Sequence, residues 1–241
     1  MDKFLEIIKE SIKVFINTSS RSNKKLKVLH SGIRDLLQEK FKKEGIKLDL
    51  VSLTLDSSVE DMVKGRYYDK RVDISIRDDK IIGAIGVKFV MNNYSQNANN
   101  YFENMLGETA NIRSADIPYF QIFILFDKVP YFDNNGRIKR IEVLSQDTHL
   151  KKYIKLSEDD VNLFYHTPIL TLLTIISLPE EVFETNNKEE FNKKMLKAIM
   201  ENKLRYSDKF DSNIFKNNVI LNDYNSFLKR LISYLQFKGH I

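Results

Sequence analysis

The chain has 241 residues, 42% of them hydrophobic and 29% charged, an ordinary balance for one globular domain or for one domain with a helical extension. The lack of cysteine excludes disulfides, thiolate metal sites and a cysteine nucleophile, and no apolar run approaches the roughly 20 residues that span a bilayer, so we expect a protein of a reducing cytoplasm, neither exported nor inserted in a membrane. The formal net charge of +5 favours a polyanionic partner, although the Lys- and Asn-rich composition of low-GC genomes explains it equally well.

Apolar periodicity predicts a mixture of helices and strands in the first 150 residues. In chain order, the expected elements are amphipathic helices at 3–17 and 24–43, a strand at 46–55, a β-hairpin at 71–89, a polar helix near 96–113, a buried strand at 119–126 and a basic strand at 134–144. The run at 119–126 is apolar and rich in aromatic residues, which is typical of a central strand covered on both faces. We therefore expect an α/β core at 1–150.

The last third of the chain has a different pattern. Most of 157–238 is expected to be helical, with a buried segment at 167–178 and amphipathic helices near 188–203 and 222–237. We therefore expect residues 151–241 to form a helical part that packs on the α/β core as one globule.

The hairpin at 71–89 carries an acid on one strand and a lysine on the other. With a two-residue turn, Asp73 falls opposite Ala84, and with a loop two residues longer it falls opposite Gly86. In either register Asp73 and Lys88 project from the same face. Such a pair could hold a divalent cation and orient the water that attacks a phosphodiester, although a cross-strand ion pair explains the same two residues.

A second acid is missing from the lysine strand, because Gly86 stands two residues before Lys88. When the helix near 96–113 is plotted at 100° per residue, Glu103 lies with small residues on one flank and Glu108 lies on the other. The small residues would let the Glu103 flank approach the sheet. We therefore expect Glu103 to supply the missing carboxylate and Glu108 to lie out of reach, with a solvated helix residue as the competing interpretation of Glu103.

Three segments within 60–127 carry a family resemblance: YDKRVDISI, IGAIGVKF and NANNYFENMLGETA. Together they resemble the PD-(D/E)XK phosphodiesterase superfamily, in particular type II restriction endonucleases. The resemblance implies a restriction-endonuclease-like core with a central mixed β-sheet flanked by helices, and Mg²⁺ as the cofactor. It also implies that Asp73 is the metal-binding acid and Lys88 the catalytic lysine.

This sequence departs from the family pattern in two places. Arg71-Val72 replaces the proline before the acid, and Gly86 replaces the acid of the (D/E)-x-K element. Some restriction enzymes of the family take that acid from the following helix, and Glu103 lies where such a carboxylate is expected. The resemblance thus implies Asp73, Lys88 and Glu103 as catalytic residues, with Asp73 and Glu103 as the metal ligands.

Basic residues flank the expected site and would neutralise the phosphates of duplex DNA. The residues predicted to bind DNA are Lys64, Arg66, Lys70, Arg71, Arg137, Lys139 and Arg140. Interleaved tyrosines, among them Tyr67 and Tyr68, could stack on bases or pack on sugars. Runs of this kind are usually solvated faces, and here the two interpretations carry about equal weight.

Other possible ligands have weaker signals. Glu39 and Glu60 could each add a carboxylate, although each is more typical of a surface acid. His30, His149 and His166 are scattered without ligand spacing, which argues against a zinc site.

The sequence therefore predicts a type II restriction endonuclease that hydrolyses duplex DNA with Mg²⁺ in a bacterium or an archaeon. A homodimer is expected, because two-fold symmetry suits the cutting of both strands of a palindromic site. The missing acid at Gly86 favours an alternative, a non-catalytic DNA-binding protein on the same fold. A third hypothesis is a helical interaction protein whose charged surface binds other proteins.

Overall fold

The structure, a computed structural model, describes residues 2–18, 22–55 and 60–241. Its helices are α1 (Lys3–Asn17), α2 (Lys24–Lys43), α3 (Tyr94–Arg113), α4 (Lys151–Ser157), α5 (Lys188–Met200) and α6 (Tyr224–Phe237). Its strands are β1 (Asp49–Ser52), β2 (Met62–Lys64), β3 (Asp69–Arg71), β4 (Ile74–Arg77), β5 (Ile81–Val90), β6 (Tyr119–Phe126), β7 (Lys128–Phe132), β8 (Ile138–Val143), β9 (Leu170–Ser177), β10 (Arg205–Tyr206) and β11 (Val219–Leu221). Short helical turns lie at η1 (Gln146–Leu150), η2 (Glu180–Val182) and η3 (Ser212–Ile214).

The centre of the fold is a mixed sheet. Among the described residues it has seven strands in the order β1-β4-β5-β6-β9-β10, and β11 also pairs with β9. β4 and β5 form an antiparallel hairpin, whereas β5, β6 and β9 run parallel. Every residue of β6 and β9 is buried, as expected for strands covered on both faces. The prediction of a buried central strand at 119–126 is confirmed.

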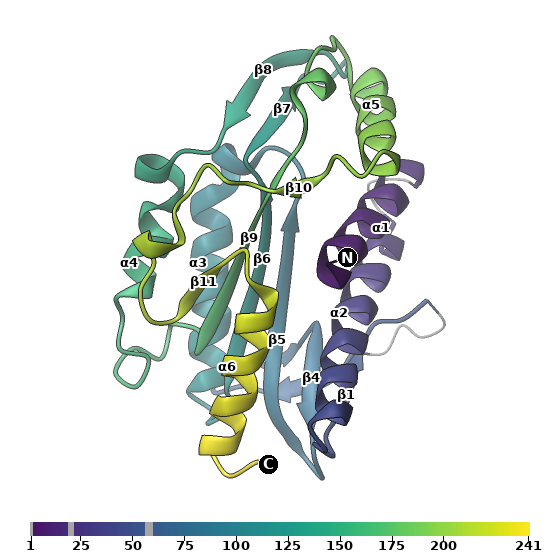
Figure 1. The fold of residues 1–241 in the computed structure, drawn as a ribbon. Helices are drawn as coiled ribbons and strands as arrows, with labels where there is room; N and C mark the ends of the chain where they lie inside the picture. The colour runs from purple at the N-terminus through teal and green to yellow at the C-terminus, as the bar shows by residue number, and fades with distance from the viewer. Residues whose placement is uncertain (1, 19–21, 56–59) are drawn as a thin grey trace.

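Helices cover both faces of this sheet, with α1 and α2 on the right in Figure 1 and α3 and α4 on the left. Alternate residues of β6 face two different cores: Ile122 and Ile124 pack with the side of α1, α2 and α6, while Phe123 and Leu125 pack with the side of α3 and α4. The prediction of an α/β fold with a mixed sheet flanked by helices is thus confirmed. In the described ranges no helix has the length and apolarity that crossing a membrane requires.

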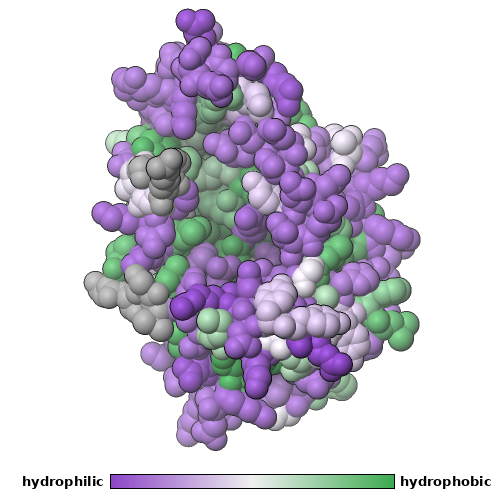
Figure 2. Space-filling model, turned by 180° about the vertical axis from the view of Figure 1, so that it is seen from behind, coloured by the Kyte–Doolittle hydropathy of each residue, from purple (hydrophilic) through white to green (hydrophobic). Residues whose placement is uncertain are grey.

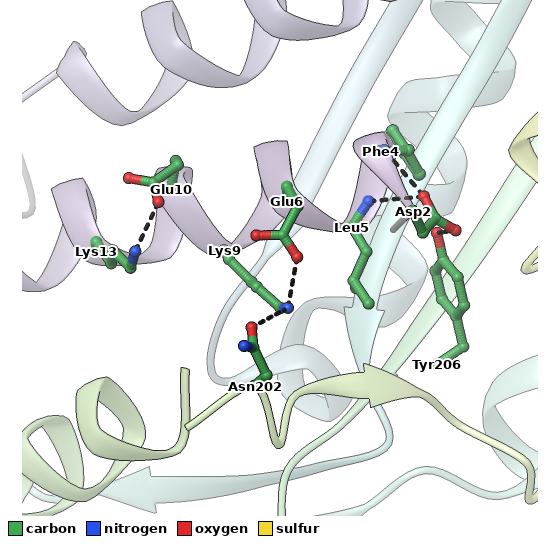
Figure 3. Close-up of polar contacts among 9 residues, drawn as sticks. All are labelled: Asp2, Phe4, Leu5, Glu6, Lys9, Glu10, Lys13, Asn202 and Tyr206. Atoms are coloured by element: carbon green, nitrogen blue, oxygen red, sulfur yellow. Dashed lines mark hydrogen bonds and ion pairs between the residues drawn. The ribbon is translucent and has the colours of Figure 1, made fainter. Parts of the chain in front are cut away.

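Polar contacts tie α1 to the C-terminal part of the chain (Figure 3). Asp2 caps the helix by accepting hydrogen bonds from two backbone N–H groups of the first turn, and it accepts another from the Tyr206 hydroxyl at 2.8 Å. The buried Lys9 ammonium donates to Glu6 at 2.6 Å and to Asn202 Oδ1 at 3.2 Å. The first helix and residues 202–206 therefore hold each other in place.

The prediction that 157–238 is mostly helical is wrong, because this region contains β9, β10 and β11. The apolar run at 167–178 is largely β9, which pairs in parallel with β6 from the first part of the chain. A short apolar run looks the same in a buried helix and in a buried strand, and here the Thr and Ile residues favour the strand. The helices predicted near 188–203 and 222–237 are confirmed as α5 and α6.

Candidate functional site

The β4–β5 hairpin places Asp73 beside the middle of β5. Ile74 pairs with Ile85, so the ladder, continued by one residue, puts Asp73 opposite Gly86, as in the longer of the two expected registers. Asp73 comes directly before β4, which begins at Ile74. Its carboxylate accepts a hydrogen bond from the backbone N–H of Val87 on β5 at 2.7 Å. This hydrogen bond to the backbone of β5 fixes the position of the carboxylate.

Asp73 and Lys88 line one cavity of about 280 Å³ between α2 and α3. In the parallel ladder Lys88 pairs with Phe123, which belongs to the core on the α3 side of the sheet. The exposed Lys88 side chain places Nζ 4.8 Å from the centre of the Tyr101 ring on α3. The structure therefore brings together the two residues that the strand pattern predicts to share a face.

A second cavity of about 140 Å³ adjoins the first, because Leu26, Phe89 and Tyr101 line both. Together they form a groove between the N-terminal helices and α3. Figure 2, seen from behind relative to Figure 1, shows a hollow with hydrophobic residues at its floor and hydrophilic residues around it. The floor is apolar, while charged side chains, including Lys70 and Arg71 from β3, line the first cavity.

Two side chains that line this cavity and one beside it could together hold a metal ion. His30 on α2, Glu60 before β2 and Asp73 each offer one ligand atom, and these atoms lie within 4.8 Å of one another. His30 is 1% exposed, and its Nδ1 lies 3.7 Å from Asp73 Oδ1. Among the described residues neither ring nitrogen of His30 has a hydrogen-bond partner. A buried imidazole without a partner costs stability, so a ligand role accounts for a feature that packing does not.

The protonation of these three groups reflects their burial. Burial raises the pKa of the Asp73 carboxyl to about 6, against the opposing effect of the Val87 N–H. Burial also raises the pKa of Glu60, and the nearby Asp73 charge adds to the rise. For His30, burial lowers the pKa to about 4, so the imidazole is neutral at pH 7. Burial therefore disfavours the charged forms of all three groups. A bound divalent cation would stabilise the ionised forms of Asp73 and Glu60 and so lower their pKa values.

The helix acid nearest to Asp73 is Glu108 and not Glu103. Of these two acids, the described cavity lining includes Glu108, while Glu103 is exposed. Glu108 forms an ion pair with Lys70 at 3.0 Å, and its Oε1 lies 3.1 Å from the Tyr119 hydroxyl. The expectation that the Glu103 flank approaches the sheet is wrong, because that flank of α3 faces solvent.

The space beside Gly86 is filled by the next strand. A Cβ atom at Gly86 would lie 1.9 Å from the Tyr119 hydroxyl oxygen and 2.9 Å from Gln121 Oε1. The Tyr119 ring is 1% exposed and packs in its own small core, so it has little room to move. An acid at position 86 is therefore excluded by the packing of β6 against β5.

The basic residues predicted to bind DNA lie in two separate places. Lys64, Arg66, Lys70 and Arg71 belong to the β2–β3 hairpin, and the last two line the cavity. Arg137, Lys139 and Arg140 lie in and before β8, in the β7–β8 hairpin at the top of Figure 1. Arg140 there pairs with Glu142 at 3.0 Å and lies over the Tyr131 ring.

The two weaker carboxylate candidates separate in the structure. Glu39 pairs with Lys3 and Lys43 on the surface of the N-terminal helices, whereas Glu60 lies beside Asp73. Sequence reasoning misses His30, since no second ligand stands at a fixed spacing from it. The one available signal is its place on the apolar stripe of α2, next to Leu29 and one turn before Ile33, which predicts burial of an imidazole.

No protein-family model matches the chain, and searches of the curated proteins and of the solved structures found no match either. The fold and the site therefore define the class on their own. The chain is an α/β protein with a mixed sheet. Lys88, His30 and Asp73 line its cavity between α2 and α3, and His30 and Asp73 form with the neighbouring Glu60 a group that could bind a metal ion.

Proposed function

We propose that this chain is a divalent-metal-dependent endonuclease that hydrolyses phosphodiester bonds of duplex DNA, of the type II restriction-endonuclease kind that the sequence resembles. The observation that carries the proposal is the meeting of Asp73 and Lys88 in one cavity, next to the His30 imidazole, whose ring nitrogens have no hydrogen-bond partner within 2–18, 22–55 and 60–241. A carboxylate for a metal and an ammonium for a phosphate are the two charges that this chemistry needs.

The residues present fit a divalent ion. Asp73, Glu60 and His30 would hold it, through two carboxylate oxygens and one imidazole nitrogen. When bound, the ion supplies a Lewis acid for the charge that develops on the phosphate oxygens. Carboxylates suit Mg²⁺, while an imidazole in the set favours Mn²⁺ and other transition metals, so both Mg²⁺ and Mn²⁺ belong in the assay.

The chain's own residues would act on the reacting phosphate. The Lys88 ammonium would donate hydrogen bonds to a non-bridging phosphate oxygen and to the attacking water. Asp73 is held by the Val87 N–H, so its position does not depend on the substrate. Glu108 and Lys70 neutralise each other at the cavity wall, which leaves Lys88 and Arg71 to meet the DNA backbone.

The proposal includes a homodimer in the cytoplasm of a bacterium or an archaeon. One cavity cuts one strand, and a two-fold pair of cavities would place a second cut on the complementary strand. The net charge of +5 agrees with a polyanionic partner.

Incubation of the wild-type protein with plasmid and phage DNA tests the proposal. We expect discrete fragments with Mg²⁺ or Mn²⁺ and none with EDTA. Salt-sensitive retention of DNA without cleavage under any metal would favour the non-catalytic DNA-binding protein instead. A protein that neither cleaves nor retains DNA under these conditions would contradict the proposal that DNA is the partner.

A further inference from the structure

The β2–β3 hairpin stands apart from the central sheet and ends in a short exposed tip. Met62 pairs with Arg71 and Lys64 with Asp69, which leaves residues 65–68 as the turn. Val63 on β2 is fully buried in a small core with Tyr119, Ile112 and Val72. The hairpin is thus anchored on one side and free to meet a partner on the other; we call residues 66–68 the tip.

The tip is held rigid by one buried side chain. Asn111 on α3 is 1% exposed, and its Oδ1 accepts hydrogen bonds from the backbone N–H of Tyr67 at 2.9 Å and of Tyr68 at 3.4 Å. Its Nδ2 donates to the Tyr68 carbonyl at 2.9 Å, and its own carbonyl accepts from the Arg66 N–H at 2.9 Å. A Cβ at Gly65 would lie 2.1 Å from Asn111 Nδ2, so glycine is required for this close approach.

The side chains of this fixed tip point into solvent. Tyr67 is 79% exposed and Tyr68 is 53% exposed. Arg66, the residue before Tyr67, is exposed as well. A protein gains nothing for its own stability by holding two aromatic rings in water on a rigid turn. Rings presented in this way contribute to binding, because little conformational freedom is lost when the partner arrives.

The charge of the hairpin indicates which partner fits. Residues 62–71 contain four basic residues and one acidic residue, Asp69. Glu108 neutralises Lys70, which leaves Lys64, Arg66 and Arg71 as the basic charges of the hairpin. A second copy of this chain, itself positively charged, would be repelled by this surface, whereas the phosphates of nucleic acid would be attracted.

The hairpin also connects the tip to the candidate active site. Lys70 and Arg71 line the same cavity as Asp73 and Lys88. Only Tyr68 and Asp69 lie between Tyr67 and Lys70 in the chain, so the tip lies close to the cavity.

We propose that the tip is a pre-formed contact for duplex DNA, in which the Tyr67 ring packs against the duplex beside the cleaved phosphate and Arg66 binds a backbone phosphate. This inference rests on the proposed function, because it takes the phosphate bound at the cavity as its reference point. The tip and the cavity then grip one duplex together, with Asn111 setting the distance between them.

Binding of a labelled duplex of about 30 base pairs, measured by fluorescence anisotropy with Ca²⁺ in place of Mg²⁺, tests this inference. Tyr67→Ala should weaken binding at least about tenfold, as truncation of an aromatic anchor does, while Tyr67→Phe should bind as wild type. Arg66→Ala should weaken binding and lower the slope of log affinity against log salt by about 0.9. Tyr67→Ala should leave that slope unchanged.

Matched controls are Phe237→Ala, an 85% exposed ring at the end of α6, and Arg205→Ala, an exposed arginine on β10. Wild-type affinity in Tyr67→Ala, or losses in the controls as large as those at the tip, would overturn this inference and leave the proposed function intact. Absence of DNA binding by the wild type would overturn both. A wild-type dimer that Tyr67→Ala converts to a monomer without DNA would assign the tip to a second copy of the chain and overturn the inference.

Discussion

Asp73→Asn should abolish metal-dependent DNA cleavage and, in the metal-free protein, increase the free energy of unfolding. The carboxylate is a proposed metal ligand, and a neutral carboxamide is a poor substitute for it with a hard cation. Without metal the same carboxylate opposes folding, because burial raises its pKa from 3.8 to about 6. Asn keeps an oxygen that can accept the Val87 hydrogen bond, so only the charge is removed.

The stabilisation has a defined pH range. A raised pKa in the folded state means that the folded protein binds the proton more tightly than the unfolded chain does, so wild-type stability falls as pH rises from about 4 to about 6. Above pH 6, Asp73→Asn should gain about 1–2 kcal/mol, a value reduced from the full shift because the side chain is partly exposed. At pH 4 the gain should be small, and it should vanish well below the unfolded pKa of 3.8, where Asp73 is protonated in both states.

Urea denaturation in EDTA at pH 8 and pH 4 measures this difference. A metal-free Asp73→Asn protein that is less stable than wild type at pH 8 would show that the carboxylate is a structural acid with a favourable charge. The pair of results, lost cleavage and raised stability, distinguishes a functional carboxylate from a residue that the fold needs.

Lys88→Ala should lower the cleavage rate by about 10²–10³-fold or more, as the loss of one preorganised charge at a reacting group does. The side chain is exposed, so folding should be unaffected, and DNA affinity should change little because the proposed phosphate contacts of Arg66 and Arg71 would remain. Lys80→Ala is the matched control, since Lys80 is an exposed lysine at the turn of the same β4–β5 hairpin.

Single-turnover cleavage with saturating enzyme separates the rate from the affinity. Wild-type rates in Lys88→Ala would remove the proposed mechanism, whatever the cleavage pattern. Equal losses in Lys88→Ala and Lys80→Ala would point to a general effect of hairpin charge.

The shared face of Asp73 and Lys88 could be predicted because it depends only on the two-residue period of strands. Either register of the hairpin leaves both side chains on one side, and in the structure a β-bulge after Ile76 brings Asp73 opposite Gly86. The role of Gly86 could not be predicted, since the Tyr119 ring that fills its space comes from β6, over thirty residues later.

The choice between Glu103 and Glu108 failed for a geometric reason. A helical plot gives the angle between two residues, but the side of the apolar stripe that meets the sheet edge depends on how the helix docks. In α3, Met105 and Thr109 are buried and Glu108 turns toward Lys70 and Tyr119. The partners that fix this orientation come from β3 and β6, outside the helix.

The candidate metal ligands come from distant parts of the chain. His30 comes from α2 and Glu60 from the segment before β2, and both reach Asp73 only in the folded chain, so no local spacing reveals them. The strand β9 could not be predicted for another reason: its apolar residues suit a buried helix as well as a buried strand.

Anomalous scattering from crystals soaked in Mn²⁺, recorded on both sides of the manganese absorption edge, is the most direct measurement of the proposed metal centre. We expect a strong peak about 2.0–2.6 Å from ligand atoms of Asp73, Glu60 and His30. The same soak of Asp73→Asn crystals should lose the peak. A wild-type crystal with no peak at these residues, at a Mn²⁺ concentration that supports DNA cleavage, would contradict the assignment of this cavity as the metal centre.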